Sequence, residues 1–156
     1  MKNIIIKPEK EHLYSEQLLC ILIGAFSIIF LGSDDVFIKT VSFLAMCCCI
    51  LSIFVFWLWL QNLKWVITEE TLEIYSGILN KNKDMLELYR VVDYQETQSF
   101  IQRVFGIKNL IIHSTDRNNK RVVICGVKEN NTAIDVIRER VEYNKQLKRV
   151  YEISNR

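Results

Sequence analysis

The sequence has few of the residues from which catalytic centres and metal sites are usually built. Its 156 residues include only two histidines, His12 and His113, and no acid–base partner is apparent for either of them. The five glycines form neither a G-x-x-x-x-G-K-S/T phosphate loop nor a G-x-G-x-x-G dinucleotide motif. No C-x-x-C pair occurs, and no group of cysteines and histidines has the spacing of a zinc site. These absences predict a protein that is not an enzyme and that binds no metal or cofactor.

An excess of charge of one sign is also missing. Residues 61–156 carry 16 Lys and Arg against 13 Asp and Glu, so this part of the chain is only mildly basic. A domain that binds nucleic acid is expected to have a pI above about 9 and a basic stripe, whereas the pI of this sequence is about 8.2. We therefore expect no nucleic-acid partner.

Cysteines are present, but their positions indicate packing rather than redox chemistry. Cys20 and Cys47–Cys49 lie inside hydrophobic segments, and Cys125 lies in a strand-like stretch. A buried cysteine behaves as a small hydrophobic residue, and a free thiol fits a reducing compartment. Acylation of Cys47–Cys49 stays open as an alternative, because cysteines near a membrane surface can carry lipid.

The hydrophobic residues are concentrated in the first half of the chain. Thr40–Leu60 is 21 residues long and carries no charge, and about 20 apolar residues span the roughly 30 Å core of a bilayer. This segment predicts a transmembrane helix over about residues 38–61. The candidate aromatic anchors at the headgroup level are Trp57, Trp59 and Trp65.

A shorter hydrophobic segment precedes this helix. Leu18–Leu31 gives 14 uninterrupted apolar or small residues, roughly 21 Å of helix, which is short of a full span unless flanking residues extend it. Gly32–Asp35 is typical of a turn. We therefore expect a first helix over about residues 14–32, and a transmembrane hairpin within residues 1–63. A cleaved signal peptide is the alternative, but acidic residues before the segment disfavour it.

Lysines are distributed unevenly around the two segments. Lys2, Lys7 and Lys10 precede the first segment, Lys39 lies between the two, and Lys64, Lys81 and Lys83 follow the second. Because short cytoplasmic segments carry the excess of Lys and Arg, this distribution predicts that both termini are cytoplasmic.

After the second segment, the pattern changes to short runs of alternating hydrophobicity. Strands are expected at Trp65–Thr68, Leu72–Tyr75, Met85–Tyr89, Val91–Gln98, Lys108–Ser114 and Lys120–Cys125. A short helical turn is expected at Ser99–Phe105. About six or seven strands at this spacing favour a sandwich or a small barrel over residues 64–156.

The last part of the chain has a helical pattern. Thr132 is the candidate N-cap, and Asn130 and Asn131 before it are alternatives. Apolar residues follow at i, i+3 and i+7 from Ile134, and the charged residues between them, Arg140 included, are expected to face water. We expect an amphipathic helix over about residues 131–151 that covers the open end of the barrel.

Several of these segments, in this order, resemble bacterial pleckstrin-homology (PH-like) membrane proteins. The resemblance rests on Trp65–Thr68, Ile74–Leu79, Leu86–Val91, Gln98–Ile107 and Gly126–Val127. The family usually has proline where this chain has Glu87. The resemblance implies a two-helix transmembrane hairpin followed by one PH-like split β-barrel with a C-terminal helix. It also implies an integral protein of the bacterial inner membrane and a binding or assembly module.

The basic residues close to the hairpin in sequence are candidate contacts for an anionic lipid headgroup. These residues are Lys64, Lys81, Lys83 and Arg90. Each such charge contributes roughly 1 kcal/mol near an anionic leaflet. Ordinary solvated loop residues are the alternative interpretation, because Asp84 and Glu87 lie among them.

We therefore expect a non-catalytic, membrane-tethered PH-like module that recruits a protein partner or assembles copies of itself through exposed strand edges. One alternative is anionic-lipid sensing through the basic strand loops. Another is that the hairpin itself acts, as in a small transport-accessory or immunity protein.

Overall fold

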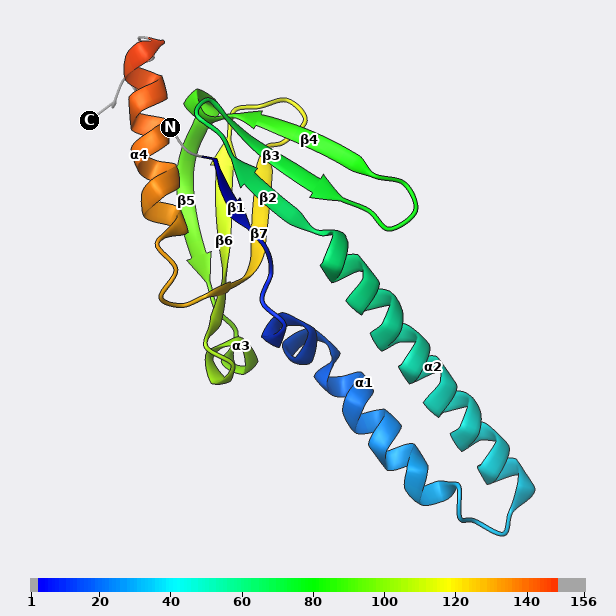
Figure 1. Cartoon of the computed structure of the whole chain (residues 1–156). Coiled ribbons are helices and arrows are strands. Elements are labelled where there is room, and N and C mark those ends of the chain that lie inside the picture. Colours follow the sequence, from blue (N-terminus) through cyan, green and yellow to red (C-terminus); the bar gives the residue numbers. More distant parts are fainter. Residues whose placement is uncertain (1–2, 149–156) are drawn as a thin grey trace.

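The computed structural model describes residues 3–148, in which a long helical hairpin projects from a domain of two sheets and a helix (Figure 1). In chain order the elements are β1 (Ile4–Ile6), α1 (Glu11–Phe30), α2 (Val36–Asn62), β2 (Lys64–Ile67), β3 (Thr71–Ser76), β4 (Asn82–Glu87), the 3-10 turn η1 (Leu88–Arg90), β5 (Val91–Thr97), α3 (Phe100–Val104), β6 (Ile107–Ser114), β7 (Arg121–Lys128) and α4 (Ala133–Leu147).

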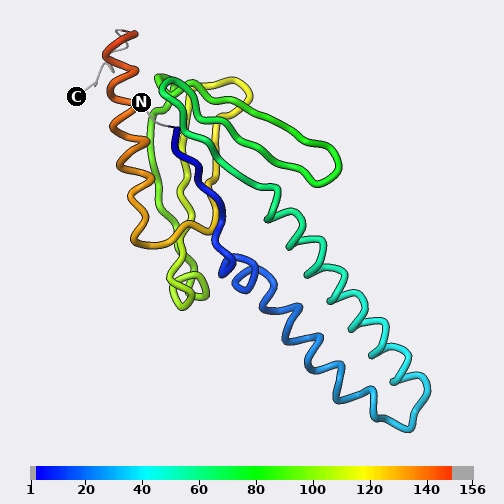
Figure 2. Tube along the Cα trace, viewed as in Figure 1, coloured from blue at the N-terminus to red at the C-terminus, as the bar shows by residue number. Residues whose placement is uncertain are grey.

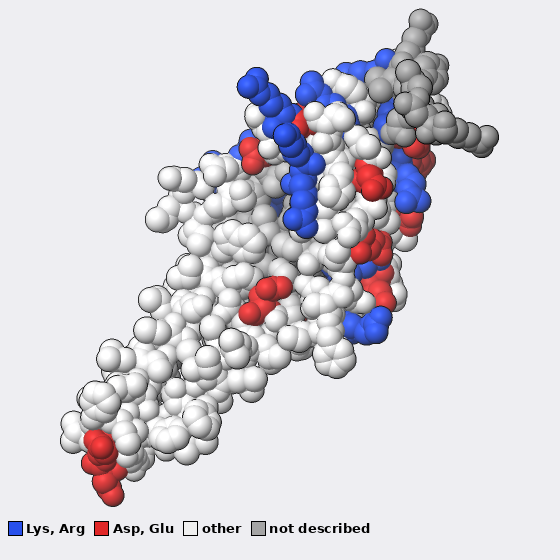
Figure 3. Space-filling model, turned by 180° about the vertical axis from the view of Figure 1, so that it is seen from behind, with Lys and Arg blue, Asp and Glu red and all other residues white. Residues whose placement is uncertain are grey.

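The two helices of the hairpin lie side by side (Figure 2). They leave most of their apolar surface exposed. In the most apolar 18-residue stretch of each helix, only 11% of α1 and 6% of α2 are buried among the described residues. Neither helix therefore packs inside the domain as the core helix of a soluble fold would. Seen from behind, the hairpin surface is almost free of charged side chains between its acidic tip and the domain (Figure 3). Both helices are long and apolar enough to cross a membrane.

The bounds of the two helices differ slightly from the expected ones. α1 begins at Glu11 rather than near residue 14, and the buried His12 in its first turn packs against Gly126 of the domain. α2 begins at Val36, two residues earlier than expected. Its N-cap is Asp35, whose Oδ1 accepts a hydrogen bond of 2.9 Å from the N–H of Phe37.

The first sheet contains a strand that sequence analysis missed. Its order is β1-β2-β3-β4, all antiparallel, and Ile6 of β1 pairs with Trp65 of β2. β1 is only three isoleucines long, so it shows no alternation of apolar and polar residues from which a strand could be predicted. The segment before the hairpin is thus part of the same sheet as the three strands after it.

The second sheet has the order β5-β6-β7, also antiparallel. The expected helical turn between β5 and β6 is present as α3. Ser99 and Gln102 form a capping box there, in which each side chain bonds the backbone N–H of the other residue. Gly106, at φ +64°, then turns the chain into β6.

The inward faces of both sheets pack against α4. The core includes Trp65, Leu72, Leu88, Ile112, Ile124, Ile137 and Val141. The expectation that Arg140 faces water was wrong, because this side chain is 5% exposed and bonds the β2–β3 turn. Thr132 makes no side-chain cap, and Oδ1 of Asn131 instead accepts a hydrogen bond from the N–H of Ala133. The expected helical residues after 148 lie outside the described part of the chain.

Candidate functional site

The candidate site is a cleft between the end of α2 and the first sheet, which we call the lysine cleft. Its volume is about 420 Å³. Its lining consists of Lys7, Gln61, Asn62, Lys64, Tyr75, Ser76, Gly77, Lys81 and Asn82. Three lysines and no carboxylate are therefore among its walls, at the place where the hairpin joins the domain.

Strand register brings two of these lysines together from distant parts of the sequence. Because Ile6 pairs with Trp65 in an antiparallel ladder, Lys7 comes opposite Lys64 one residue further along. On the other side of Lys64, β2 pairs it with Tyr75, and Nζ of Lys64 lies 4.4 Å from the centroid of that ring. The aromatic face thus holds the ammonium group of Lys64 at the cleft wall.

Lys83 belongs to the same row but already has a carboxylate partner. It pairs with Tyr75 across β3 and β4, and its Nζ lies 2.8 Å from Oε1 of Glu73. The hydroxyl of Tyr75 donates to the other carboxylate oxygen at 2.7 Å. These bonds lower the pKa of Glu73, and the bond to Glu73 raises the pKa of Lys83, so both groups stay charged at neutral pH. Among the described residues, Lys7 and Lys81 have no carboxylate partner.

The third lysine is positioned by a tight turn between β3 and β4. Gly77 has φ +106°, and a Cβ at this position would lie 1.9 Å from the carbonyl oxygen of Asn80. Only glycine fits this turn without a backbone shift. The turn returns the chain toward the hairpin, and Lys81 follows directly on the cleft wall.

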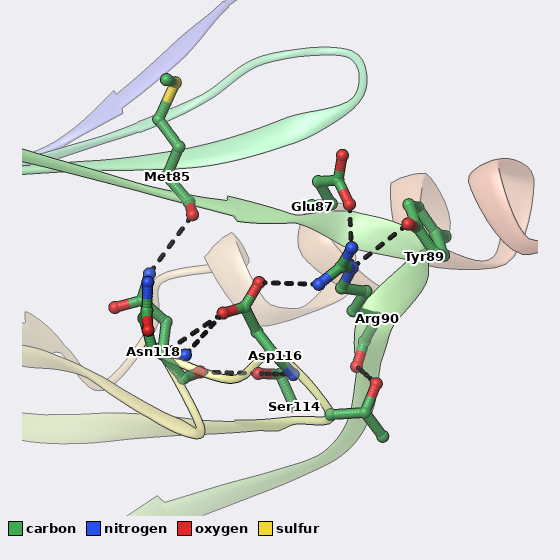
Figure 4. A network of polar contacts seen from close by, with 9 residues as sticks. Met85, Glu87, Tyr89, Arg90, Ser114, Asp116 and Asn118 are labelled. Carbon is green, nitrogen blue, oxygen red and sulfur yellow. Dashed lines mark hydrogen bonds and ion pairs between the residues drawn. The ribbon is translucent and has the colours of Figure 1, made fainter.

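Arg90 does not join the lysine cleft. It lies beyond the opposite end of β4, inside a network of polar contacts (Figure 4). Its Nε lies 2.8 Å from Oε2 of Glu87, and its Nη1 donates to Oδ2 of Asp116 at 3.2 Å. The pKa of Asp116 is lowered, and the main cause is the hydrogen bonds that it accepts from the backbone N–H groups of Asn118 and Asn119. Arg90 therefore links β4 to the β6–β7 loop, and its charge is shared with two carboxylates.

The three tryptophans have different environments. Trp57 is 44% exposed on α2 and stacks on Phe54 at 6.1 Å, which suits an anchor at the headgroup level. Trp59 is half-buried against Phe56 and the edge of the core. The interpretation of Trp65 as an anchor was wrong, because β2 points this side chain into the core, where it is 1% exposed.

A second contact between hairpin and domain is found at the start of α1. The N–H of Glu9 donates to the carbonyl of Gly126 at 2.8 Å, and His12 packs over the Cα of Gly126. Cys125 lies beside them in the wall of a largely apolar cavity, and burial raises the pKa of its thiol to about 11. Sequence analysis missed this contact because nothing local relates residue 12 to residue 126.

A helical hairpin of this length and apolarity, followed by two antiparallel sheets and a C-terminal helix, is consistent with a PH-like domain carried on candidate transmembrane helices. Residues 18–143 match the family model described as Bacterial PH domain, and the chain belongs to that family. PH-like domains are generally non-catalytic binding modules, and no catalytic family is indicated. No match was found among curated proteins or solved structures.

Proposed function

We propose that this protein is a membrane-embedded PH-like module that binds the phosphate of an anionic lipid headgroup in the lysine cleft. The observation that carries the proposal is the convergence of Lys7, Lys64 and Lys81 at the base of the hairpin with no carboxylate among the cleft walls. A cavity of about 420 Å³ is within the usual size range of small-ligand sites, roughly 300–1,000 Å³.

The placement of the cleft supports a lipid as the ligand. Both β1 and the domain lie at the same end of the hairpin (Figure 1), as two membrane crossings require. The lysine distribution favours the cytoplasm for this end, where anionic lipids give the leaflet its negative potential. A cleft between α2 and the sheet then lies at headgroup level, at a height fixed by the hairpin. The hairpin already tethers the domain, so lipid bound in the cleft would serve recognition of a headgroup and not recruitment of the domain.

The local charges favour an anion despite the opposing dipole of α2 and the carboxylate of Glu73, which interacts with both Lys64 and Lys83. The C-terminal end of α2 borders the cleft at Gln61 and Asn62, and a helix C-terminus carries roughly −0.5 of an elementary charge. Three lysines outweigh this contribution, and Asn62 bonds the carbonyl of Leu58 through its side chain. The net local charge of the cleft is therefore positive and attracts a phosphate group.

Replacing Lys7, Lys64 and Lys81 together with glutamine should abolish selective retention of anionic lipid. Each charge contributes roughly 1 kcal/mol, so the preference for phosphatidylglycerol over phosphatidylcholine is expected to fall roughly 100-fold. The measurement is native mass spectrometry of the full chain titrated with each lipid, with a soluble phosphate monoester as a third ligand. Competition by that monoester would identify free phosphate as an equally good ligand.

The matched control removes three charges from the end of the domain remote from the hairpin. Lys120, Arg121 and Lys148 are replaced with glutamine, which gives the same change of net charge. This control variant should keep the lipid preference. Equal preference in the wild type and the cleft variant would contradict the proposal, and equal loss in both variants would show a general charge effect without a site.

Recruitment of a protein is the second candidate function, and the free edge of β1 favours it. β1 is an edge strand of the first sheet, and Ile5 on it is 61% exposed. A groove of about 470 Å³ separates β1 from the first turn of α4, with Ala133 and Val136 in its wall. An extended segment of a partner, or of a second copy, could add to this edge by strand pairing.

A photo-crosslinking residue at position 5 tests this second function in native membranes. We expect crosslinking to one defined protein, or to a second copy of the chain, from position 5. A probe at Val92, which is also apolar and exposed on an edge strand, should give no such product. Identical products from both positions would mean random collision and would remove the support for recruitment at β1.

A further inference from the structure

We propose that two apolar tips of the domain insert into the same leaflet as the base of the hairpin, so that the domain is held face-down on the bilayer. The first tip is α3, with Phe100, Ile101 and Val104. The second is the β3–β4 turn, with Ile78 and Leu79. This inference rests on the membrane location proposed above and adds the surface through which the domain itself contacts lipid.

The helix α3 has the opposite polarity from a helix on a water-exposed surface. Its polar residue Gln102 is 4% exposed, whereas Phe100 is 81% and Val104 70% exposed. A helix packed on a soluble domain normally buries its apolar side chains and exposes its amide. The capping box between Ser99 and Gln102 fixes this arrangement. The apolar side chains of α3 are therefore held outward.

The position of α3 places these side chains beside the hairpin. Figure 1 shows α3 at the hairpin end of the domain, next to the start of α1. The rings of Tyr14 and Phe105 stack there, with centroids 6.4 Å apart and an interplanar angle of 26°. The outward side chains of α3 thus lie beside the first turns of α1, at the hairpin end of the domain.

The β3–β4 turn provides a second apolar tip beside α2. Leu79 is 94% exposed at this turn. Ile78 lines a shallow apolar depression together with Val55, Phe56 and Trp59 of α2. Since Gly77 locks the backbone of the turn, Leu79 is held outward. This tip therefore continues the exposed apolar surface of α2.

The bilayer is the occupant that these observations favour over a second copy of the chain. The tips adjoin different helices, α3 next to the start of α1 and the turn next to α2, and the turn shares an apolar depression with α2. Charged groups border both tips, Arg103 in α3 and Lys81 after the turn, and can extend from the interface to the headgroups. An interfacial apolar face with a basic rim is the pattern of a membrane-surface segment.

The test measures the depth of single fluorescent probes in nanodiscs that each hold one copy of the full chain. The five native cysteines are replaced with alanine, and one cysteine is introduced for labelling at Leu79, Phe100 or Val104. We expect these probes to be quenched by nitroxide lipids and shielded from aqueous quencher, about 5–10 Å below the headgroup level. Probes at Val92 and Leu147, which are 52% and 62% exposed, should be quenched from water only. One copy per disc excludes protection by a second chain.

Two additional measurements distinguish failure of this inference from failure of the proposed membrane location. A probe at Leu44 in α2 reports on the hairpin alone. If the tip probes are exposed to water while the Leu44 probe lies deep in the bilayer, this inference is overturned and the proposed membrane location stands. If the Leu44 probe is also exposed to water, both are overturned. Hydroxyl-radical footprinting of the unaltered protein checks the result without substitutions. Phe100 and Leu79 should be protected relative to Tyr143 and Leu147, and equal oxidation would contradict insertion.

Discussion

Replacing Gly126 with alanine is expected to separate the start of α1 from the domain and to lower the free energy of unfolding by about 2–4 kcal/mol. Gly126 has φ +62°, which costs an L-residue about 1–2 kcal/mol. The added Cβ would also lie 2.5 Å from Cβ and 2.6 Å from Cγ of His12. Relief of that clash requires α1 to move, which breaks the bond from the N–H of Glu9 to the carbonyl of Gly126.

Gly106 provides a matched control for this substitution. It has nearly the same backbone conformation, φ +64°, but a Cβ there would meet no atom within 4 Å. Gly106→Ala should therefore show the backbone cost alone, about 1–2 kcal/mol. Denaturant unfolding of both variants in mild detergent gives the two values. If Gly126→Ala were no more destabilising than Gly106→Ala, the contact with His12 would carry no energy.

The reactivity of the Cys125 thiol measures the separation of α1 from the domain directly. Burial raises its pKa to about 11, roughly two units above that of an ordinary thiol, so at pH 8 its thiolate fraction is about 100-fold below that of a free thiol. With Cys20 and Cys47–Cys49 replaced by alanine, Cys125 should react slowly with maleimide in the folded chain. Gly126→Ala should accelerate this labelling, because movement of α1 opens the cavity beside the thiol. Gly106→Ala should leave the labelling rate unchanged.

The parts of this fold that could be predicted from sequence are those with a local physical signal. A run of 21 uncharged residues is sufficient for a helix that can cross a membrane. Alternation in Trp65–Thr68 and Leu72–Tyr75 is likewise sufficient for paired strands, and these strands are present as β2 and β3. The helical turn expected at Ser99–Phe105 is present as α3, and Gly106 after it takes a positive φ.

The residues that were misread are those whose environment is decided by distant parts of the chain. Trp65 follows the hairpin in sequence, but pairing of β2 with β1 and β3 turns it into the core. Lys7 was counted only as a topology signal, and its place in the cleft depends on the register of β1 with β2. Arg90 was grouped with the lysines by sequence distance, yet its contacts are with Glu87 and Asp116. No window of sequence contains these pairings.

Arg140 is the clearest case, and its replacement by methionine is expected to lower the free energy of unfolding by about 3 kcal/mol. Nη1 of Arg140 donates to the carbonyls of Ile67 and Thr68 at 2.8 and 2.7 Å from within the core. Hydrogen bonds from a charged donor contribute about 1.5–3 kcal/mol, and a carbonyl left buried without a partner costs about 1–3 kcal/mol. Methionine fills a similar volume but donates no hydrogen bond, so α4 should lose its main polar attachment to the β2–β3 turn.

Arg138 on the same helix is the matched control for Arg140. It is exposed, and its guanidinium lies 5.5 Å from the ring centroid of Tyr94, a contact that contributes about 0.5–1 kcal/mol at the surface. Denaturant unfolding should thus separate Arg140→Met from Arg138→Met by about 2 kcal/mol. Hydrogen exchange locates the loss, which should appear first in the amides of α4 and of the turn at Thr68–Glu70. Asn144 limits the separation of α4, because its Nδ2 still donates to the carbonyl of Glu69 at 2.6 Å. Equal unfolding energies for the two variants would show that the buried guanidinium adds nothing beyond its packing volume.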